Sequence, residues 1–415
     1  MDYSGDRCFD VIVVGAGVMG SSAAYQLSKR GLKTLLLEQF DFLHHRGSSH
    51  GESRTIRATY PEDYYNALVA ESAELWEVAQ SEIGYRVHFP TKHFDMGPTD
   101  QKSLNAVVAT CRKHGLPHRI LDSRAVAEFF SGRFNIPENW VGITTEIGGV
   151  IKPTKAVSMF QTLAMRNGAV LRDNTKVDNI VKDEETGGGV VVSTANGDKF
   201  LGKKCIITAG AWIPKLVKTV AGKDIPVEPL ETTVCYWRIK EGHEGKFAID
   251  GDFPTFASYS DPYVYGTPSL EYPGLIKVAV HGGNRCDPDK RPWRPGVRLE
   301  ELKEWIKERF GGMVDWAKGP VATQLCIYSM TPDEDFVMDF LGGEFGKDVV
   351  VGGGFSGHGF KMAPAVGRIL GELATEGVAG GGVELKHFSL RRFEENPKGN
   401  AKEYPDKVVL GAHPQ

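Results

Sequence analysis

The pattern of apolar and polar positions is clearest near the N-terminus. The run from Phe9 to Val14 is mostly apolar and β-branched, as in a strand buried on both faces of a parallel sheet. A helix-compatible stretch runs from Ser21 to Arg30 and ends at Gly31, a residue that favours helix C-caps. A second apolar run covers Lys33 to Leu37. Together these segments predict one βαβ unit of about 30 residues.

Further along the chain, the pattern alternates between two characters. Runs at 204–208 and 348–351 are typical of further parallel strands, each followed by a glycine turn and a helix-like segment. Between them, and again at 86–150, aromatic and β-rich runs are interrupted by proline and glycine. We therefore expect a mixed α/β fold with two interleaved domains. The nucleotide-binding domain takes residues 1–90, 150–225 and 326–392, the β-rich substrate domain takes 91–149 and 226–325, and residues 393–415 form a polar tail on the surface.

Length, charge and cysteine count narrow the class of protein. A chain of 415 residues is too long for one ordinary domain. Its net charge of -4 gives no overall basic footprint for nucleic acid. The sequence has no uncharged apolar stretch of about 18 residues, so it predicts no membrane span. The six cysteines form no CxxC pair, so the sequence predicts neither a metal site nor a disulfide framework.

The two ends of the sequence favour a soluble intracellular protein. The first seven residues lack the basic and then apolar layout of a secretory signal. The last four residues, Ala412 to Gln415, do not resemble the Ser-Lys-Leu type of peroxisomal signal. The cytoplasm and the peroxisome both stay open as compartments.

Glycine is the one overrepresented residue, with 49 of 415 positions, or about 12% against roughly 7% on average. Gly15, Gly17 and Gly20 form a GxGxxG motif between the first strand and the first helix. In that context the motif predicts a tight turn whose backbone approaches a pyrophosphate. Glu38 follows the second strand, close to the ~20-residue spacing expected of a ribose-binding carboxylate. The motif alone does not choose between FAD and NAD.

Four further motifs follow one another along the chain. They are Gly47-Ser48-Ser49-His50-Gly51-Glu52-Ser53-Arg54-Thr55-Ile56-Arg57, Lys277-Val278-Ala279-Val280-His281, Cys326-Ile327-Tyr328 and Gly354-Phe355-Ser356-Gly357-His358-Gly359-Phe360-Lys361. In these motifs and their order, the chain resembles the monomeric sarcosine oxidase family, which includes N-methyltryptophan and pipecolate oxidases. The resemblance favours FAD and implies a D-amino-acid-oxidase-like fold, with a Rossmann-like FAD-binding domain interleaved with the β-rich substrate domain.

The resemblance also implies how FAD is held. Cys326 matches the cysteine that carries the flavin through an 8α-thioether, and a thiolate is a suitable nucleophile for that methyl group. On residue type alone, Cys326 would be read as a buried filler, and the surrounding motif reverses that interpretation. The late glycine-rich loop could aim backbone N–H groups at the reduced flavin, or be a simple turn. Further cofactor contacts are expected from His50, Ser53, Arg54, Val177, Gly357, Gly359 and Lys361.

The same resemblance assigns the catalytic end. Arg57 and Lys361 would bind the substrate carboxylate, and Lys277 would promote the reaction with oxygen. His281 resembles the active-site histidine of the family. As alternatives, Lys277 could be an edge-strand lysine that points to solvent, and His281 could be a structural histidine. Tyr265 resembles a substrate-facing tyrosine, although Tyr263 could take its place. Further candidates are Arg54 as a catalytic residue and, less firmly, Tyr60.

The combined interpretation is a flavin amine oxidase that acts as a monomer. A secondary α-amino acid, sarcosine or L-pipecolate, would lose a hydride to the flavin, and oxygen would reoxidise the flavin and yield hydrogen peroxide. Two alternatives lie outside this class of enzyme. One is an NAD-dependent dehydrogenase, which leaves the three later motifs without a role. The other is a flavin-binding module without turnover. Within the class, N-methyltryptophan is a further possible substrate.

Overall fold

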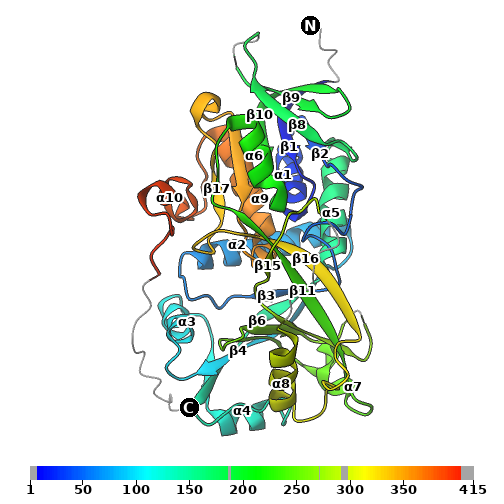
Figure 1. The fold of residues 1–415 in the computed structure, drawn as a ribbon, viewed down its shortest axis with the longest axis vertical. Coiled ribbons are helices and arrows are strands. Elements are labelled where there is room, and N and C mark those ends of the chain that lie inside the picture. Colours follow the sequence, from blue (N-terminus) through cyan, green and yellow to red (C-terminus); the bar gives the residue numbers. More distant parts are fainter. Residues whose placement is uncertain (1–6, 186–187, 271, 291–297, 403–415) are drawn as a thin grey trace.

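Two β-sheets organise the chain, one in each half of the molecule (Figure 1). The structure is a computed structural model that describes residues 7–185, 188–270, 272–290 and 298–402. The helices are α1 (Val18–Lys29), α2 (Tyr65–Ile83), α3 (Lys102–Lys113), α4 (Ser123–Phe129), α5 (Pro153–Arg166), α6 (Ile213–Ala221), α7 (Glu244–Phe247), α8 (Leu299–Arg309), α9 (Ala363–Glu376) and α10 (Arg391–Glu395). Among the described residues, none of these helices has the length and apolar character needed to cross a membrane.

The first sheet has a parallel centre. Strand β1 pairs in parallel with β2 and with β10, β10 pairs in parallel with β18, and β2 pairs in parallel with β7. At the edges, β17 pairs antiparallel with β18, and the β8–β9 hairpin extends β10. The strands are β1 (Cys8–Val14), β2 (Thr34–Leu37), β7 (Val170–Arg172), β8 (Val177–Lys182), β9 (Val190–Thr194), β10 (Lys199–Ile207), β17 (Val337–Phe340) and β18 (Val349–Gly353).

Both faces of this sheet are covered, as the β-branched runs predict. Alternate residues of β1 point to opposite sides: Val11 and Val13 pack with α1, α2, α5 and α9, while Ile12 and Val14 pack toward α6 and the β8–β9 hairpin. The predicted βαβ unit is confirmed as β1, α1 and β2. Its glycine turn therefore lies at the carboxyl end of a central strand, where doubly wound sheets bind their ligands.

The second sheet is mostly antiparallel and draws on distant parts of the chain. Its path runs β15-β11-β14-β13-β12-β4-β6-β3, with β16 on β11 and β5 on β6. The strands are β3 (Arg54–Arg57), β4 (His88–Pro98), β5 (Arg119–Leu121), β6 (Trp140–Ile151), β11 (Glu228–Arg238), β12 (Thr255–Ser258), β13 (Val264–Thr267), β14 (Leu275–Val280), β15 (Asn284–Arg285) and β16 (Ala322–Met330).

One face of the second sheet carries an aromatic core. Phe94, Phe134, Phe256 and Phe310 pack there with residues of α4 and α8. Because side chains alternate along a strand, the neighbouring residues of β13 and β14 point to the opposite face. That second face is turned toward the first sheet, and it carries the polar residues of the candidate site.

Candidate functional site

A cavity of about 1100 Å³ is lined by residues of both sheets. The glycine turn and Glu38 lie at one end, and Arg57 and Lys361 lie at the other. The structure brings most of the predicted residues to this one cavity. Those that line it are Gly15, Gly17, Glu38, Arg54, Arg57, Val177, Tyr265, Lys277, His281, Cys326, Gly357, Gly359 and Lys361.

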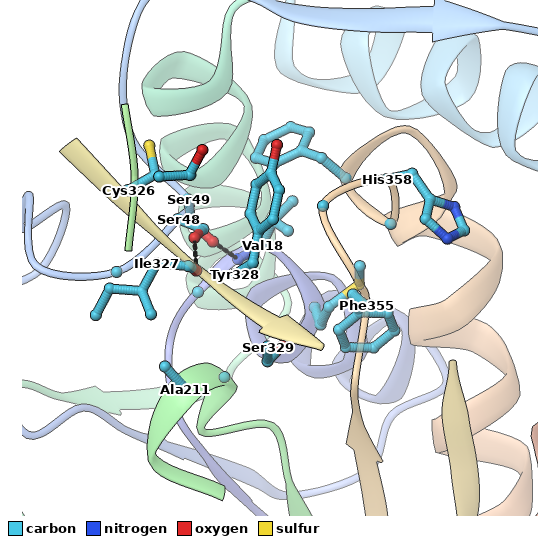
Figure 2. A pocket seen from close by; sticks show the side chains of 18 of the residues that line it. Val18, Ser48, Ser49, Ala211, Cys326, Ile327, Tyr328, Ser329, Phe355 and His358 are labelled. Carbon is cyan, nitrogen blue, oxygen red and sulfur yellow. Dashed lines mark hydrogen bonds between the residues drawn. The ribbon is translucent and has the colours of Figure 1, made fainter. Parts of the chain in front are cut away.

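The turn between β1 and α1 requires its glycines. Gly15 has a φ of +101°, a conformation that side chains rarely adopt. A Cβ on Gly20 would lie 1.9 Å from the carbonyl oxygen of Gly15, so strand and helix could not pack as they do. A Cβ on Gly17 would lie 3.0 Å from Ser49 Oγ, which accepts a hydrogen bond from Val18 N at the start of α1 (Figure 2). The turn therefore presents bare backbone to the cavity, as a phosphate cradle needs.

Glu38 closes this end of the cavity. It follows β2 directly and is 6% exposed. Its Oε2 accepts a hydrogen bond of 2.8 Å from Ala16 N in the glycine turn, and its Oε1 accepts one of 3.1 Å from Phe40 N. His44 Nε2 lies 3.5 Å from Oε1. A carboxylate held at the edge of the turn suits the hydroxyls of a ribose and disfavours a 2′-phosphate.

Cys326 lies on β16, lines the cavity and is 3% exposed (Figure 2). Three nitrogen atoms lie near its sulfur: Arg54 Nη2 and Gln324 Nε2 donate to it at 3.6 and 3.5 Å, and His50 Nε2 lies 3.9 Å away. Arg54 is fixed in turn, because its Nη2 also donates to the carbonyl oxygens of Ser48 and His50. The Cys326 sulfur therefore lies in a polar environment at the wall of the cavity.

Lys277 lies on β14, which is an internal strand between β11 and β13. The edge-strand alternative is therefore wrong, and the side chain is buried with only 3% exposed. Its Nζ donates a 2.8 Å hydrogen bond to the carbonyl oxygen of Ser53 and lies 5.6 Å from the centre of the Tyr265 ring. Burial, together with the charge of Arg54, lowers the pKa of the Lys277 ammonium to about 7. The group can therefore gain or lose a proton near neutral pH.

Arg57 and Lys361 converge at the far end of the cavity. Arg57 Nη1 donates a 2.7 Å hydrogen bond to Tyr259 Oη and lies 3.5 Å from Asp95 Oδ1. Burial disfavours its charge, but the surrounding tyrosines and Asp95 outweigh burial and raise the pKa of Arg57. Lys361 lies in the 3-10 turn Phe360–Met362 that precedes α9. Its Nζ donates to Tyr60 Oη at 2.9 Å and to the carbonyl oxygen of His358 at 2.8 Å.

The two cations share one aromatic neighbour. The Tyr60 ring lies 4.7 Å from the Arg57 guanidinium and 5.4 Å from Lys361 Nζ. Burial and the adjacent Arg57 charge hold the pKa of Lys361 well below its usual value. A carboxylate placed between Arg57 and Lys361 would offset both the burial and the repulsion, so this end of the cavity is suited to an anion.

His281 and the two candidate tyrosines line the cavity between these ends. His281 directly follows β14, and its backbone N donates to the carbonyl oxygen of Tyr263 at 2.9 Å. Its ring lies 5.4 Å from the Tyr328 ring, and burial lowers its pKa. Tyr265 lies beside Lys277, whereas Tyr263 lies beside His281. The two tyrosines thus face different parts of the cavity.

The glycine-rich loop after β18 packs closely against β16. Gly357 has a φ of +78°, and a Cβ there would lie 2.6 Å from the Tyr328 ring. A Cβ on Gly359 would lie 2.7 Å from Phe355 Cβ. Phe355 and His358 of this loop are labelled in Figure 2 among the residues that line the cavity. These close contacts explain why the loop needs glycine at both positions.

Three predicted residues support the cavity without lining it. Gly20 allows α1 to approach β1, Ser53 accepts the Lys277 hydrogen bond through its carbonyl oxygen, and His50 lies behind the Cys326 sulfur. Sequence reasoning missed Tyr259 and Asp95, the partners of Arg57. Both lie on strands or strand ends far from Arg57 in the chain, and no local pattern marks them.

Comparison with known proteins places this site in a family. The family described as DAO, FAD dependent oxidoreductase, matches residues 10–373. A probable sarcosine oxidase of Arabidopsis thaliana is 80% identical over 411 residues, which are 99% of this chain and 99% of that protein. The peroxisomal sarcosine oxidase of Homo sapiens is 34% identical, over 93% of this chain and 96% of its own length. The predicted resemblance is thereby confirmed.

Solved structures confirm the predicted fold class. NikD, described as an unusual amino acid oxidase essential for nikkomycin biosynthesis, matches with a TM-score of 0.79. The match covers 92% of this chain and 97% of that chain at 23% sequence identity. At that identity the likeness supports the fold alone.

Proposed function

The chain belongs to the DAO family of FAD-dependent oxidoreductases, as a flavin amine oxidase of the sarcosine oxidase type, and from this membership we propose that it oxidises a small secondary α-amino acid with oxygen. Sarcosine and L-pipecolate are the proposed substrates, and hydrogen peroxide is the proposed product. The observation that carries the proposal is the cavity itself. It joins a phosphate cradle, a buried cysteine among hydrogen-bond donors and a pair of buried cations in one continuous space.

The described residues suit FAD over its whole length. The bare backbone of Gly15 and Gly17 would hold the pyrophosphate at the start of α1, and Glu38 would hold the ribose. Val177 lines the cavity at the same end, where the adenine would lie. Cys326 would form the 8α-S-cysteinyl bond. Arg54, His50 and Gln324, which contact its sulfur, would hold the side chain in position for that bond.

Arg57 and Lys361 would bind the substrate carboxylate. Arg57 offers a planar fork whose Nη1 is already oriented by Tyr259. Lys361 adds a point charge that Tyr60 and the His358 carbonyl group hold in place. The carboxylate would thereby fix the amine nitrogen and its neighbouring carbon in the part of the cavity lined by Tyr265 and His281.

The chemistry supplied by bound FAD is acceptance of a hydride from the carbon beside the amine nitrogen, followed by transfer of two electrons to oxygen, which with two protons gives hydrogen peroxide. The resulting imine hydrolyses in water. Lys277 would hold a proton near the site of oxygen reduction, where its positive charge stabilises developing negative charge. Burial and the neighbouring charge of Arg54 lower the pKa of Lys277, and no contact with a cofactor is needed to explain it.

A substrate panel tests the proposal. Purified holoenzyme should release peroxide with sarcosine or L-pipecolate. It should release far less with sarcosine amide, which keeps the secondary amine but lacks the carboxylate that Arg57 and Lys361 would bind. N-methyltryptophan tests whether the cavity takes a larger side chain. A protein that contains FAD and yields peroxide with none of the secondary amino acids would refute the proposed substrate class.

We propose the peroxisome, before the cytoplasm, as the compartment. Its support is the proposed peroxide product and the name of the human relative, a peroxisomal sarcosine oxidase. The predicted lack of a Ser-Lys-Leu-type end rests on residues 412–415, which lie outside the described part of the chain. A fluorescent protein fused to the N-terminus, leaving the C-terminus free, should colocalise with a peroxisomal marker. Diffuse cytoplasmic fluorescence would contradict this assignment.

A further inference from the structure

The C-terminal strap is defined as residues 391–402. It lies on the outside of the half that contains the first sheet, and it reaches the candidate site. It begins with α10, and in Figure 1 it runs from this short red helix down toward α3. The sequence predicted that the residues from 393 onward form a surface tail. Lys398 and Lys402 are exposed, and together with Asn400 they also line the cavity. Residues 403–415 lie outside the described part of the chain.

The strap is anchored to the β16–β17 loop, residues 331–336, by a buried ion pair. Arg392 is 7% exposed and Asp333 is 6% exposed. Arg392 Nε donates to Asp333 Oδ2 at 2.7 Å, and its Nη2 donates to Asp333 Oδ1 at 3.2 Å and to the Asp335 carbonyl oxygen at 2.9 Å. Such a two-pronged pair is geometrically strict, so it fixes the loop relative to α10.

A second set of contacts comes from the end of the strap. Asn400 N donates to Asp333 Oδ2 at 2.8 Å, and its Nδ2 donates to Asp335 Oδ2 at 2.8 Å. Asp335 is fully buried and also accepts hydrogen bonds from Tyr64 and Tyr65. Lys402 Nζ lies 3.0 Å from Glu62 Oε1 and 3.9 Å from Asp335 Oδ1. The strap therefore holds both aspartates of the loop, Asp333 and Asp335.

Glu334 lies between these two anchored aspartates, at the wall of the cavity. Its φ of +63° is a left-handed conformation, which costs free energy in a residue that is not glycine. Its carbonyl oxygen accepts a 2.9 Å hydrogen bond from His358 Nε2, and its carboxylate lies 4.0 Å from His281 Nε2. The anchors on both sides explain how the chain keeps this strained conformation.

We propose that the C-terminal strap determines substrate specificity, with Asn400 as a positioning residue that holds the β16–β17 loop against the substrate end of the cavity. The proposal rests on the proposed amine oxidase function. By fixing Asp333 and Asp335, the strap sets where Glu334 stands relative to His281. It also supplies part of the wall that a bulky substrate would meet. Loosening the strap should widen this end and favour larger amino acids over sarcosine.

Hydrogen–deuterium exchange tests the holding of the loop, and it needs no turnover. Asn400→Ala removes the Nδ2 hydrogen bonds to Asp335 and to the carbonyl oxygen of His387. Amide exchange in a peptide that covers 331–336 should become roughly tenfold faster in the holoenzyme. Arg391→Ala is the matched control. Arg391 lies on the same strap, but its exposed side chain pairs with Glu395 instead of the loop. Unchanged exchange in Asn400→Ala would overturn the proposed positioning.

Substrate selection tests the specificity claim. The ratio of kcat/KM for L-pipecolate to that for sarcosine should rise about threefold or more in Asn400→Ala and stay at the wild-type value in Arg391→Ala. Lys402→Ala, which removes the contacts to Glu62 and Asp335, should shift the ratio in the same direction and serves if Asn400→Ala folds poorly.

The outcomes of the two measurements are distinct. A loop that exchanges faster with an unchanged ratio would show that the strap is structural only, which overturns its role in specificity. If the wild-type holoenzyme acts on neither amino acid, the proposed function fails. In that case a benzoate-to-acetate ratio of dissociation constants, measured from the flavin absorbance, takes the place of the kinetic ratio. An unchanged benzoate-to-acetate ratio in Asn400→Ala would then overturn the strap proposal.

Discussion

At the scale of single residues, the most informative group is the buried lysine. Lys277 has a pKa of about 7, so it is protonated below that pH and neutral above it. If its charge promotes oxygen reduction, the rate constant of the reduced enzyme with oxygen should fall as the pH rises through about 7. Lys277→Met should lower that rate constant by about two orders of magnitude and remove its pH dependence.

Stopped-flow measurement separates the two half-reactions of this variant. Anaerobic reduction by substrate should change much less than reoxidation, because Lys277 does not contact the carboxylate-binding pair. Lys240→Met, at an exposed position near the same sheet, is the control and should match the wild type. Equal slowing of reduction and reoxidation in Lys277→Met would argue against the oxygen role.

A second residue-scale prediction concerns the covalent link. Cys326→Ser should leave the flavin soluble after acid precipitation, whereas the wild-type flavin should stay with the pellet. Cys235→Ser is the matched control: Cys235 is equally buried, on the neighbouring strand β11, but it does not line the cavity. Flavin absorbance in the supernatant and pellet gives the answer. Flavin that pellets with Cys326→Ser would assign the link to another residue.

These residues differ in how far the sequence could predict them. Lys277 stands out because a charge interrupts an apolar run, and Cys326 because its motif resembles a known family. The environment of Arg57 has no such signal. Its partners Tyr259 and Asp95 come from the end of β12 and from β4, and only the pairing of β4 with β12 and β6 brings them near. Contacts between strands far apart in sequence depend on register, which local patterns do not encode.

At the scale of elements, the glycine turn permits a graded test. Gly20→Ala places a Cβ against the carbonyl oxygen of Gly15 and should lower the free energy of unfolding by about 1–3 kcal/mol or more. Gly17→Ala only crowds Ser49, so the protein should fold but bind less FAD. Gly245→Ala, where no atom lies within 4 Å of the added Cβ, is the control. Thermal unfolding and the flavin-to-protein absorbance ratio measure the two effects. A Gly17→Ala protein with full FAD content would contradict the phosphate-cradle role.

Elements with local periodicity were the predictable ones. The first βαβ unit follows from its apolar runs and its turn, and the structure reproduces it within a few residues. The strand order of the second sheet could not be predicted in this way, because it depends on pairing between distant segments. Strand β3 pairs with β6, and β16 pairs with β11, so segments inside the predicted nucleotide-binding ranges join the β-rich sheet. The contacts of the strap could not be predicted from its sequence either. Its polar composition suits a surface tail, but Asn400 donates hydrogen bonds to two buried aspartates.

At the scale of the whole molecule, the cavity is where the two sheets share an interior. A single chain supplies residues for both ends of this cavity, which supports the proposed monomer. We propose that the first sheet with its helices is the FAD-binding domain and the second sheet is the substrate domain. On this division FAD would touch both domains, since Gly15 belongs to the turn after β1 and Cys326 to β16.

A ligand that touches both domains should stabilise the whole molecule by mass action. Cys326→Ser protein stripped of flavin should therefore unfold at a lower temperature than the same protein reloaded with FAD. At a free FAD concentration of 100 times Kd, the expected gain is about 2.7 kcal/mol, and the Tm should keep rising with FAD concentration.

ADP makes this last experiment specific to the arrangement of the two sheets. It carries the pyrophosphate and adenosine, which suit the Gly15–Glu38 end, but it cannot reach Cys326 on the second sheet. At equal saturation, ADP should therefore raise the Tm of the half that contains the first sheet. The half that contains the second sheet should then unfold in a separate transition at lower temperature. FAD should merge the two transitions into one. A calorimetric trace with the same single transition for the stripped, ADP-loaded and FAD-loaded protein would contradict the bridging role of the cofactor.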